Sequence, residues 1–134
     1  MNELTNREMI EKAMTVLRPI KLAHDNEAGD VACALLSAGG NLYLGVCIDV
    51  CSGMGFCAEH SAIAAMITAG ETRISKIVAV WGERVVLPPC GRCREFMAQV
   101  DEMNLECTDV ILGEDHAVKL KELLPHQFGE VWST

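Results

Sequence analysis

Two apolar segments near the middle of the chain restrict the folds that it can adopt. The segment from Cys57 to about Ala69 is rich in alanine and isoleucine on nearly every face, which is typical of a helix buried inside a domain. Gly70 ends this helix, and the run Ile77–Val80 then suits a strand that is buried on both faces. A buried helix next to such a strand predicts a sheet with helices packed on it.

The remaining elements complete an alternating order of helices and strands. Thr5 and Glu8 have the spacing of a capping box, with Leu4 and Met9 placed as a hydrophobic staple, so a helix is expected to begin here. Residues 21–30 are expected to form a polar loop. We expect helices over residues 9–17, 57–69, 90–100 and 118–124, and strands over residues 31–36, 42–48, 74–81 and 108–112.

This order predicts an α/β fold with three layers, helix, sheet and helix. The sheet is expected to be mixed, with about five strands and an N-terminal β-hairpin made by residues 31–36 and 42–48. The chain has 134 residues, of which 50% are hydrophobic, and it contains no repeat, low-complexity tract or linker. We therefore expect residues 1–134 to form a single domain.

Charge and cysteine content narrow the classes of partner and compartment. The net charge of −8 argues against a nucleic-acid polymer, because phosphate contacts need clustered lysine and arginine. No segment is apolar enough for long enough to cross a membrane, and the first residues do not resemble a secretory leader. An odd number of cysteines, seven, favours the reducing cytoplasm over a disulfide framework. A small-molecule ligand is the expected partner.

Three cysteines stand where helices are predicted to begin. Cys57 starts one helix, and Cys90 and Cys93 share a face of the first turn of another. Helix N-termini carry unpaired N–H groups and a partial positive charge, which favour the thiolate form that zinc requires. If the two helices lie side by side, the three sulfurs converge. Three protein ligands leave one tetrahedral position open, which is typical of a catalytic zinc site.

Nearby charged residues suggest how such a site would work. Three thiolates around Zn²⁺ leave a net charge of −1, which the helix ends and a sulfur-bound Arg92 or Arg94 would offset. Glu59 is the carboxylate that the local sequence places at the metal. It can take a proton from the attacking water and deliver it to a ring nitrogen and then to a leaving amine.

The combined pattern resembles the cytidine deaminase superfamily. Its signature is Cys-Ala-Glu at 57–59, a gap of about thirty residues, and Pro-Cys-Gly-Arg-Cys-Arg at 89–94. Residues 31–36 also look like the family's first strand, and Glu-Leu-Leu-Pro at 122–125 looks like its C-terminal element. With cysteine as the first ligand, the chain is most similar to the small homotetrameric cytidine deaminases and to blasticidin S deaminase.

The resemblance implies a function and a set of residues. It implies a cytidine-deaminase-like fold, one Zn²⁺ per chain, and hydrolytic deamination of a free cytidine or deoxycytidine with release of ammonia. It also implies a homotetramer with active sites at subunit interfaces. The zinc ligands that it implies are Cys57, Cys90 and Cys93, and the proton shuttle is Glu59. The implied substrate contacts are Ala58, Asp49, Cys47 and Phe128, where Phe128 reaches over the nucleobase bound in a neighbouring subunit. Arg92 and His60 are the implied residues directly behind the zinc ligands.

Several departures from the family pattern concern the substrate. Cys47 and Asp49 stand where the family has an asparagine and a glutamate that hold the ribose. Gly29 replaces a common aromatic residue, His60 an arginine and Pro88 a serine. The metal motif is thus intact while the sugar contacts are altered, which leaves a modified aminopyrimidine such as blasticidin S as an alternative substrate.

Other interpretations of the cysteines remain open at this level. Cys90 and Cys93 alone have the spacing of a thioredoxin-like redox pair. A structural zinc would need a fourth protein ligand, for which Cys51 or His60 is available. The chain could also be a non-catalytic, zinc-stabilised binding protein on the same fold, although such a protein would have no need of Glu59.

Overall fold

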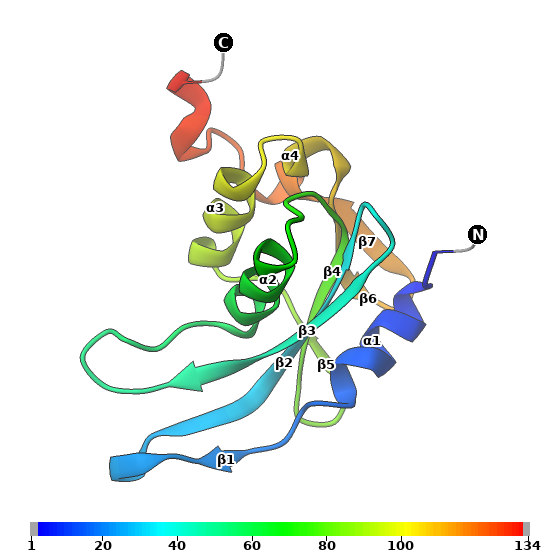
Figure 1. The fold of residues 1–134 in the computed structure, drawn as a ribbon. Helices are drawn as coiled ribbons and strands as arrows, with labels where there is room; N and C mark the ends of the chain where they lie inside the picture. Colours follow the sequence, from blue (N-terminus) through cyan, green and yellow to red (C-terminus); the bar gives the residue numbers. More distant parts are fainter. Residues whose placement is uncertain (1–2, 133–134) are drawn as a thin grey trace.

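A mixed sheet of seven strands forms the centre of the molecule (Figure 1). The computed structural model describes residues 3–132. The strands are β1 (Ile20–Lys21), β2 (Glu27–Ser37), β3 (Leu42–Asp49), β4 (Ile74–Trp81), β5 (Val85–Leu87), β6 (Asp109–Gly113) and β7 (His116–Lys119). Strand β2 pairs with β1, β3 and β4, and β4 also pairs with β5 and β6. Only the β4–β6 pair is parallel among these described strands.

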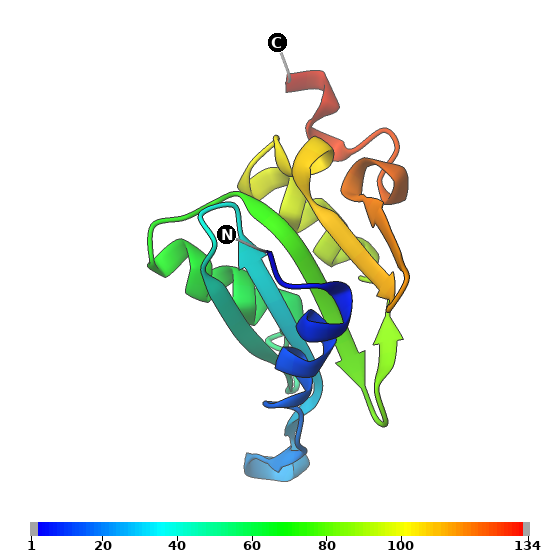
Figure 2. The same ribbon diagram turned by 90° about the vertical axis from the view of Figure 1, so that its right-hand side faces the viewer.

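Helices cover both faces of the sheet, which confirms the predicted three layers (Figure 2). The helices are α1 (Asn6–Met14), α2 (Ala58–Thr68), α3 (Gly91–Val100) and α4 (Asn104–Cys107). Helix α1 lies on one face, and α2 and α3 lie on the other. Short 3₁₀ helices span Ala23–Asp25, Leu120–Leu123 and Phe128–Trp132. In the part of the chain that the structure describes, no helix has the length and apolar character needed to cross a membrane.

The side chains of β2 divide between two cores. Cys33 and Leu35 point to the core under α2 and α3, while Ala32, Ala34 and Leu36 point to the core under α1. Successive residues of a strand face opposite sides of the sheet, so a strand covered on both faces must be apolar throughout. The same rule explains the apolar run of β4.

Close packing against β3 fixes the position of α2. A Cβ added at Gly45 would lie 2.4 Å from the backbone nitrogen of Ala62, so only glycine lets the helix lie this near the strand. The Ser61 hydroxyl adds a direct tie by donating to the carbonyl oxygen of Val46 at 2.7 Å. These contacts set where the first turn of α2 lies relative to the sheet.

Some sequence predictions are wrong at the edges of the fold. The capping box at Thr5 is confirmed, but α1 ends at Met14 rather than at residue 17. The loop expected over residues 21–30 contains β1 and the start of β2. The helix expected over residues 118–124 is replaced by β7 followed by a single 3₁₀ segment. Hydrogen bonding to β6 overrides the weak helical pattern of this short segment.

Candidate active site

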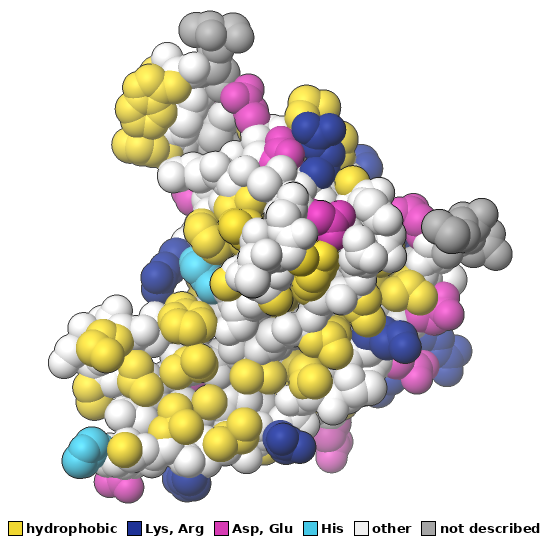
Figure 3. All heavy atoms as spheres, viewed as in Figure 1, with side chains coloured by type: hydrophobic (Ala, Val, Ile, Leu, Met, Phe, Trp, Pro, Cys, Tyr) yellow, Lys and Arg dark blue, Asp and Glu magenta, His cyan; other side chains and the backbone are white. Residues whose placement is uncertain are grey.

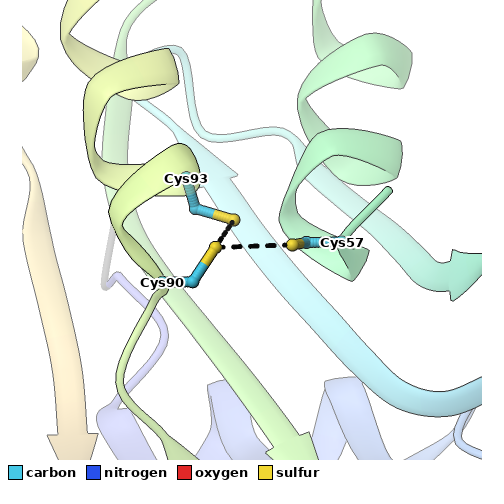
Figure 4. A group of neighbouring side chains, drawn as sticks. All are labelled: Cys57, Cys90 and Cys93. Atoms are coloured by element: carbon cyan, nitrogen blue, oxygen red, sulfur yellow. Dashed lines mark hydrogen bonds between the residues drawn. The ribbon is translucent and has the colours of Figure 1, made fainter. Parts of the chain in front are cut away.

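The first turns of α2 and α3 bring three sulfurs together (Figure 4). Cys57 is the N-cap residue of α2, Cys90 is the N-cap residue of α3, and Cys93 lies in the first turn of α3. The Sγ atoms of Cys57 and Cys90 are 3.5 Å apart, as are those of Cys90 and Cys93. All three sulfurs lie within 4.8 Å of one another. The predicted convergence at two neighbouring helix ends is confirmed.

This group of sulfurs fits a zinc ion. Zn–S bonds of about 2.3 Å in a tetrahedron place sulfurs roughly 3.8 Å apart, close to the spacings found here. Within residues 3–132 the group has three members, and neither Cys51 nor His60 supplies a fourth ligand atom to it. A site with three protein ligands is of the catalytic type.

The acidity of the thiols differs between the three positions. At Cys90 burial acts to raise the pKa, but the backbone N–H of Cys93 and the thiol of Cys57 outweigh it and hold the pKa below the usual value. Burial raises the pKa of Cys57 and Cys93 instead. Backbone N–H groups at the start of α3 thus lower the pKa of Cys90, whereas loss of water dominates at Cys57 and Cys93.

Glu59 lies in the first turn of α2 with its side chain turned toward the sulfurs. It is 5% exposed, and the nearby Cys93 thiol acts to lower the pKa of its carboxyl. Burial raises the pKa of this carboxyl above its ordinary value. A buried carboxylate at a metal-ligand group is placed to exchange protons with whatever reacts there.

A cavity of about 420 Å³ opens onto this group. Cys57, Glu59 and Cys90 line it, together with Ala58 and Arg92. Such a volume falls in the range of roughly 300–1,000 Å³ that small-molecule sites occupy. Metal ligands, a buried carboxylate and space for a ligand thus meet in one place.

Two of the predicted substrate contacts also line the cavity, next to a residue that the sequence analysis missed. Cys47 and Asp49 from β3 are joined there by Asp30 from β2. The Cys47 thiol donates to Asp30 Oδ1 at 2.9 Å and lies 3.6 Å from Asp49 Oδ2. Burial, assisted by the bond to Asp30, raises the pKa of Cys47 to about 11. The sequence feature that could have indicated Asp30 is its position as a charged residue directly before the apolar run that starts at Val31.

The sequence pattern predicts a hydrogen bond from Arg92 or Arg94 to a cysteine sulfur. In the described structure neither arginine donates one, so this prediction is wrong. Arg92 donates to the carbonyl of Gly55 at 3.3 Å. Arg94 donates to the carbonyls of Pro89 at 2.8 Å and Leu123 at 3.1 Å. Both guanidinium groups instead bind backbone carbonyls next to the site, two in loops and one in the 3₁₀ helix Leu120–Leu123.

A histidine contacts the sulfur group instead. His60 Nδ1 lies 3.6 Å from Cys93 Sγ. Burial, followed by the positive charge of Arg92, holds the pKa of His60 below its ordinary value. The expectation that His60 lies directly outside the ligands agrees with this contact.

Phe128 lies outside this chain's own cavity. It is 65% exposed and packs edge-to-face against Trp132, with ring centroids 4.9 Å apart. Its backbone N–H donates to Glu95 Oε1 at 2.7 Å. The C-terminal segment that carries it extends away from the body of the molecule (Figure 1).

Comparison with known proteins identifies the family. Residues 6–108 match the model of the cytidine and deoxycytidylate deaminase zinc-binding region. The chain belongs to this deaminase family. The cytidine deaminase of Mycobacterium tuberculosis is 34% identical over 103 residues, which cover 74% of this chain and 72% of that protein. The cytidine deaminase of Halalkalibacterium halodurans is 32% identical over 103 residues, covering 73% and 76% of the two chains.

Solved structures of cytidine deaminases share the fold. The crystal structure of the M. tuberculosis enzyme aligns with a TM-score of 0.78 at 24% identity, covering 95% of this chain and 99% of that one. The Burkholderia pseudomallei enzyme aligns with a TM-score of 0.75 at 25% identity, covering 93% and 100%. The deaminase fold and the zinc-binding motif exclude the thioredoxin-like redox pair, and the three cysteines are the residues that fit the family's zinc.

Proposed function

We propose that this deaminase hydrolyses the amino group of a free cytosine-type nucleoside, cytidine or deoxycytidine, to the uracil form with release of ammonia. We also propose that residues 1–134 form one deaminase domain. The observation that carries the proposal is that Cys57, Cys90 and Glu59 line the same cavity. Because the chain belongs to the family, it is a zinc-dependent hydrolytic enzyme. Its relatives are named cytidine deaminases.

The residues at the cavity have different roles in this reaction. Cys57, Cys90 and Cys93 would hold Zn²⁺, whose Lewis acidity makes water a nucleophile at neutral pH. Glu59 takes one proton from the attacking water and passes it to the ring nitrogen, then takes the second proton from the hydroxyl now on the ring carbon and gives it to the leaving amine. Its burial keeps bulk water from competing for these protons.

The other residues that line the cavity bear on the sugar of the substrate. Asp49 offers a carboxylate that can accept a hydrogen bond from a ribose hydroxyl, as we propose from the family resemblance. Cys47 cannot replace an amide here, because its thiol already donates to Asp30. This difference favours a second candidate substrate, an aminopyrimidine nucleoside modified at its sugar, such as blasticidin S.

Ammonia release from a panel of substrates tests the proposal. We expect the zinc-loaded protein to release ammonia from cytidine or deoxycytidine faster than from cytosine or guanine, because the cavity includes polar groups suited to a sugar. Release from blasticidin S alone would favour the second candidate. Failure to release ammonia from any of the five compounds would contradict the proposed function.

We further propose that the protein is a cytoplasmic homotetramer in which Phe128 completes a neighbouring active site. Free thiols at all seven cysteines support a reducing compartment. Hydrophobic side chains gather on the C-terminal segment and over α2 (Figure 3). Val131 and Trp132 are 80% and 65% exposed, and Ile67 on α2 is 44% exposed. Apolar groups that are this accessible are typical of surfaces that bind a partner.

Sedimentation and kinetics test the assembly. We expect a mass of four chains, and we expect Phe128→Ala to raise KM about three- to tenfold because an aromatic contact to the base is lost. Trp81→Ala is the control, because it removes an exposed aromatic side chain from strand β4, outside both the C-terminal segment and the cavity lining. A monomer with full activity would contradict this arrangement.

A further inference from the structure

His60 has a contact that the proposed mechanism leaves unused. Its Nδ1 atom lies 3.6 Å from Cys93 Sγ, a sulfur that the metal site requires as a thiolate. We propose that His60 is a positioning residue of the zinc site, whose Nδ1–H donates to the Cys93 thiolate and thereby strengthens zinc binding. The inference rests on the proposed function, since it assumes that Zn²⁺ occupies the three-cysteine group.

The packing around His60 fixes the direction of its imidazole ring. The ring stacks on that of Phe96, with centroids 4.5 Å apart and planes that differ by 4°. His60 belongs to the first turn of α2, whereas Phe96 lies one turn after Cys93 on α3. The stack therefore ties the two helices that carry the ligands and limits rotation of the ring.

Cys93 is the ligand that most needs such a donor. It is 0% exposed, so water cannot solvate the charge on its sulfur, and the Glu59 carboxylate lies against it. At Cys90 the backbone N–H groups of Cys93 and Arg92 already act to lower the pKa of the thiol. Both nearby arginine side chains donate to carbonyl oxygens instead of sulfurs.

The chemistry of the contact decides which atom is the donor. A thiolate has no proton and can only accept, so a hydrogen bond here requires the proton on Nδ1. The bond does not require a charged imidazole, because a neutral ring carries one N–H. Hydrogen bonds of this kind to a metal ligand typically change metal affinity by about 10- to 100-fold.

Substitutions that keep or remove the donor test the proposal. His60→Ala removes the donor and the ring. His60→Asn keeps an N–H close to the position of Nδ1 but cannot stack on Phe96 in the same way. Phe96→Leu keeps the histidine and removes the stacking partner. We would measure zinc affinity by competition with a chromophoric chelator, and the sulfur-to-metal charge-transfer band after loading each protein with Co²⁺.

The expected results separate hydrogen bonding from packing. His60→Ala should weaken zinc binding at least about tenfold and move the Co²⁺ band to longer wavelength, because the unbonded thiolate gives up electron density more easily. His60→Asn should stay within about threefold of the wild type, with an unmoved band. Phe96→Leu should lose a few-fold in affinity, because the donor remains but is less well fixed.

Other outcomes would overturn the proposal. The proposal fails if His60→Ala binds zinc as tightly as the wild type. It also fails if His60→Ala and His60→Asn lose the same amount of zinc affinity with unmoved Co²⁺ bands, because the effect would then come from packing. Zinc binding and ammonia release by the wild type are measured in parallel, so either result alone leaves the proposed function standing. A wild-type protein that binds no zinc would overturn both.

Discussion

Glu59→Gln is expected to lower kcat for ammonia release by at least about a thousandfold while zinc stays bound. Glutamine keeps the shape of the side chain, but its amide cannot carry a proton from water to the ring nitrogen and the amine. General acid–base catalysis is typically worth about 10²- to 10⁴-fold, and here one carboxylate serves several transfers. Steady-state kinetics and metal analysis of the same preparation would measure both quantities.

A second carboxylate provides the matched control. Glu83 is exposed in the turn between β4 and β5, and Glu83→Gln removes the same charge away from the cavity. Its kcat should stay within about twofold of the wild type, as is usual for a surface change. Activity of Glu59→Gln within tenfold of the wild type would contradict the role assigned to this residue.

Cys90→Ser is expected to reduce the zinc content from about one ion per chain to less than about a tenth. A serine hydroxyl is a poor zinc ligand, and the two remaining cysteines cannot complete the site. Metal that binds only the folded chain stabilises it, so the Tm of this variant should fall to that of the metal-free wild type. Atomic emission analysis and thermal unfolding with and without a chelator would show both effects.

Cys51→Ser is the control for this experiment. Cys51 is exposed and its thiol donates to Asn26 Oδ1 at 3.5 Å, away from the other three sulfurs. It is also a residue that the sequence left available as a fourth ligand. Full zinc content is expected in this variant. Full occupancy in Cys90→Ser, or loss of zinc in Cys51→Ser, would disagree with the ligand assignment.

The centre of the fold and the metal site could be predicted because local patterns specify them. Cys57 and Cys90 are N-cap residues of helices, as their positions after loops suggested. The apolar run over Ile77–Val80 is covered on both faces, as doubly buried strands require. The family signature over residues 57–59 and 89–94 then indicated the deamination reaction, which the local patterns alone do not specify.

Contacts between segments that are distant in the sequence could not be predicted from local patterns. Asp30 lines the cavity because β2 pairs with β3, and no local pattern marks it as a partner of Cys47. The stack of His60 on Phe96 depends on how α2 and α3 meet. The exposed position of Phe128 is likewise set by the direction that the C-terminal segment takes after the 3₁₀ helix Leu120–Leu123.

X-ray absorption at the zinc edge tests the central claim most directly, because it counts the atoms around the metal. Three cysteines and an open position predict about three sulfurs near 2.3 Å and one lighter atom near 2.0 Å. Four sulfurs, or two sulfurs with two imidazole nitrogens, would contradict a catalytic zinc held by Cys57, Cys90 and Cys93.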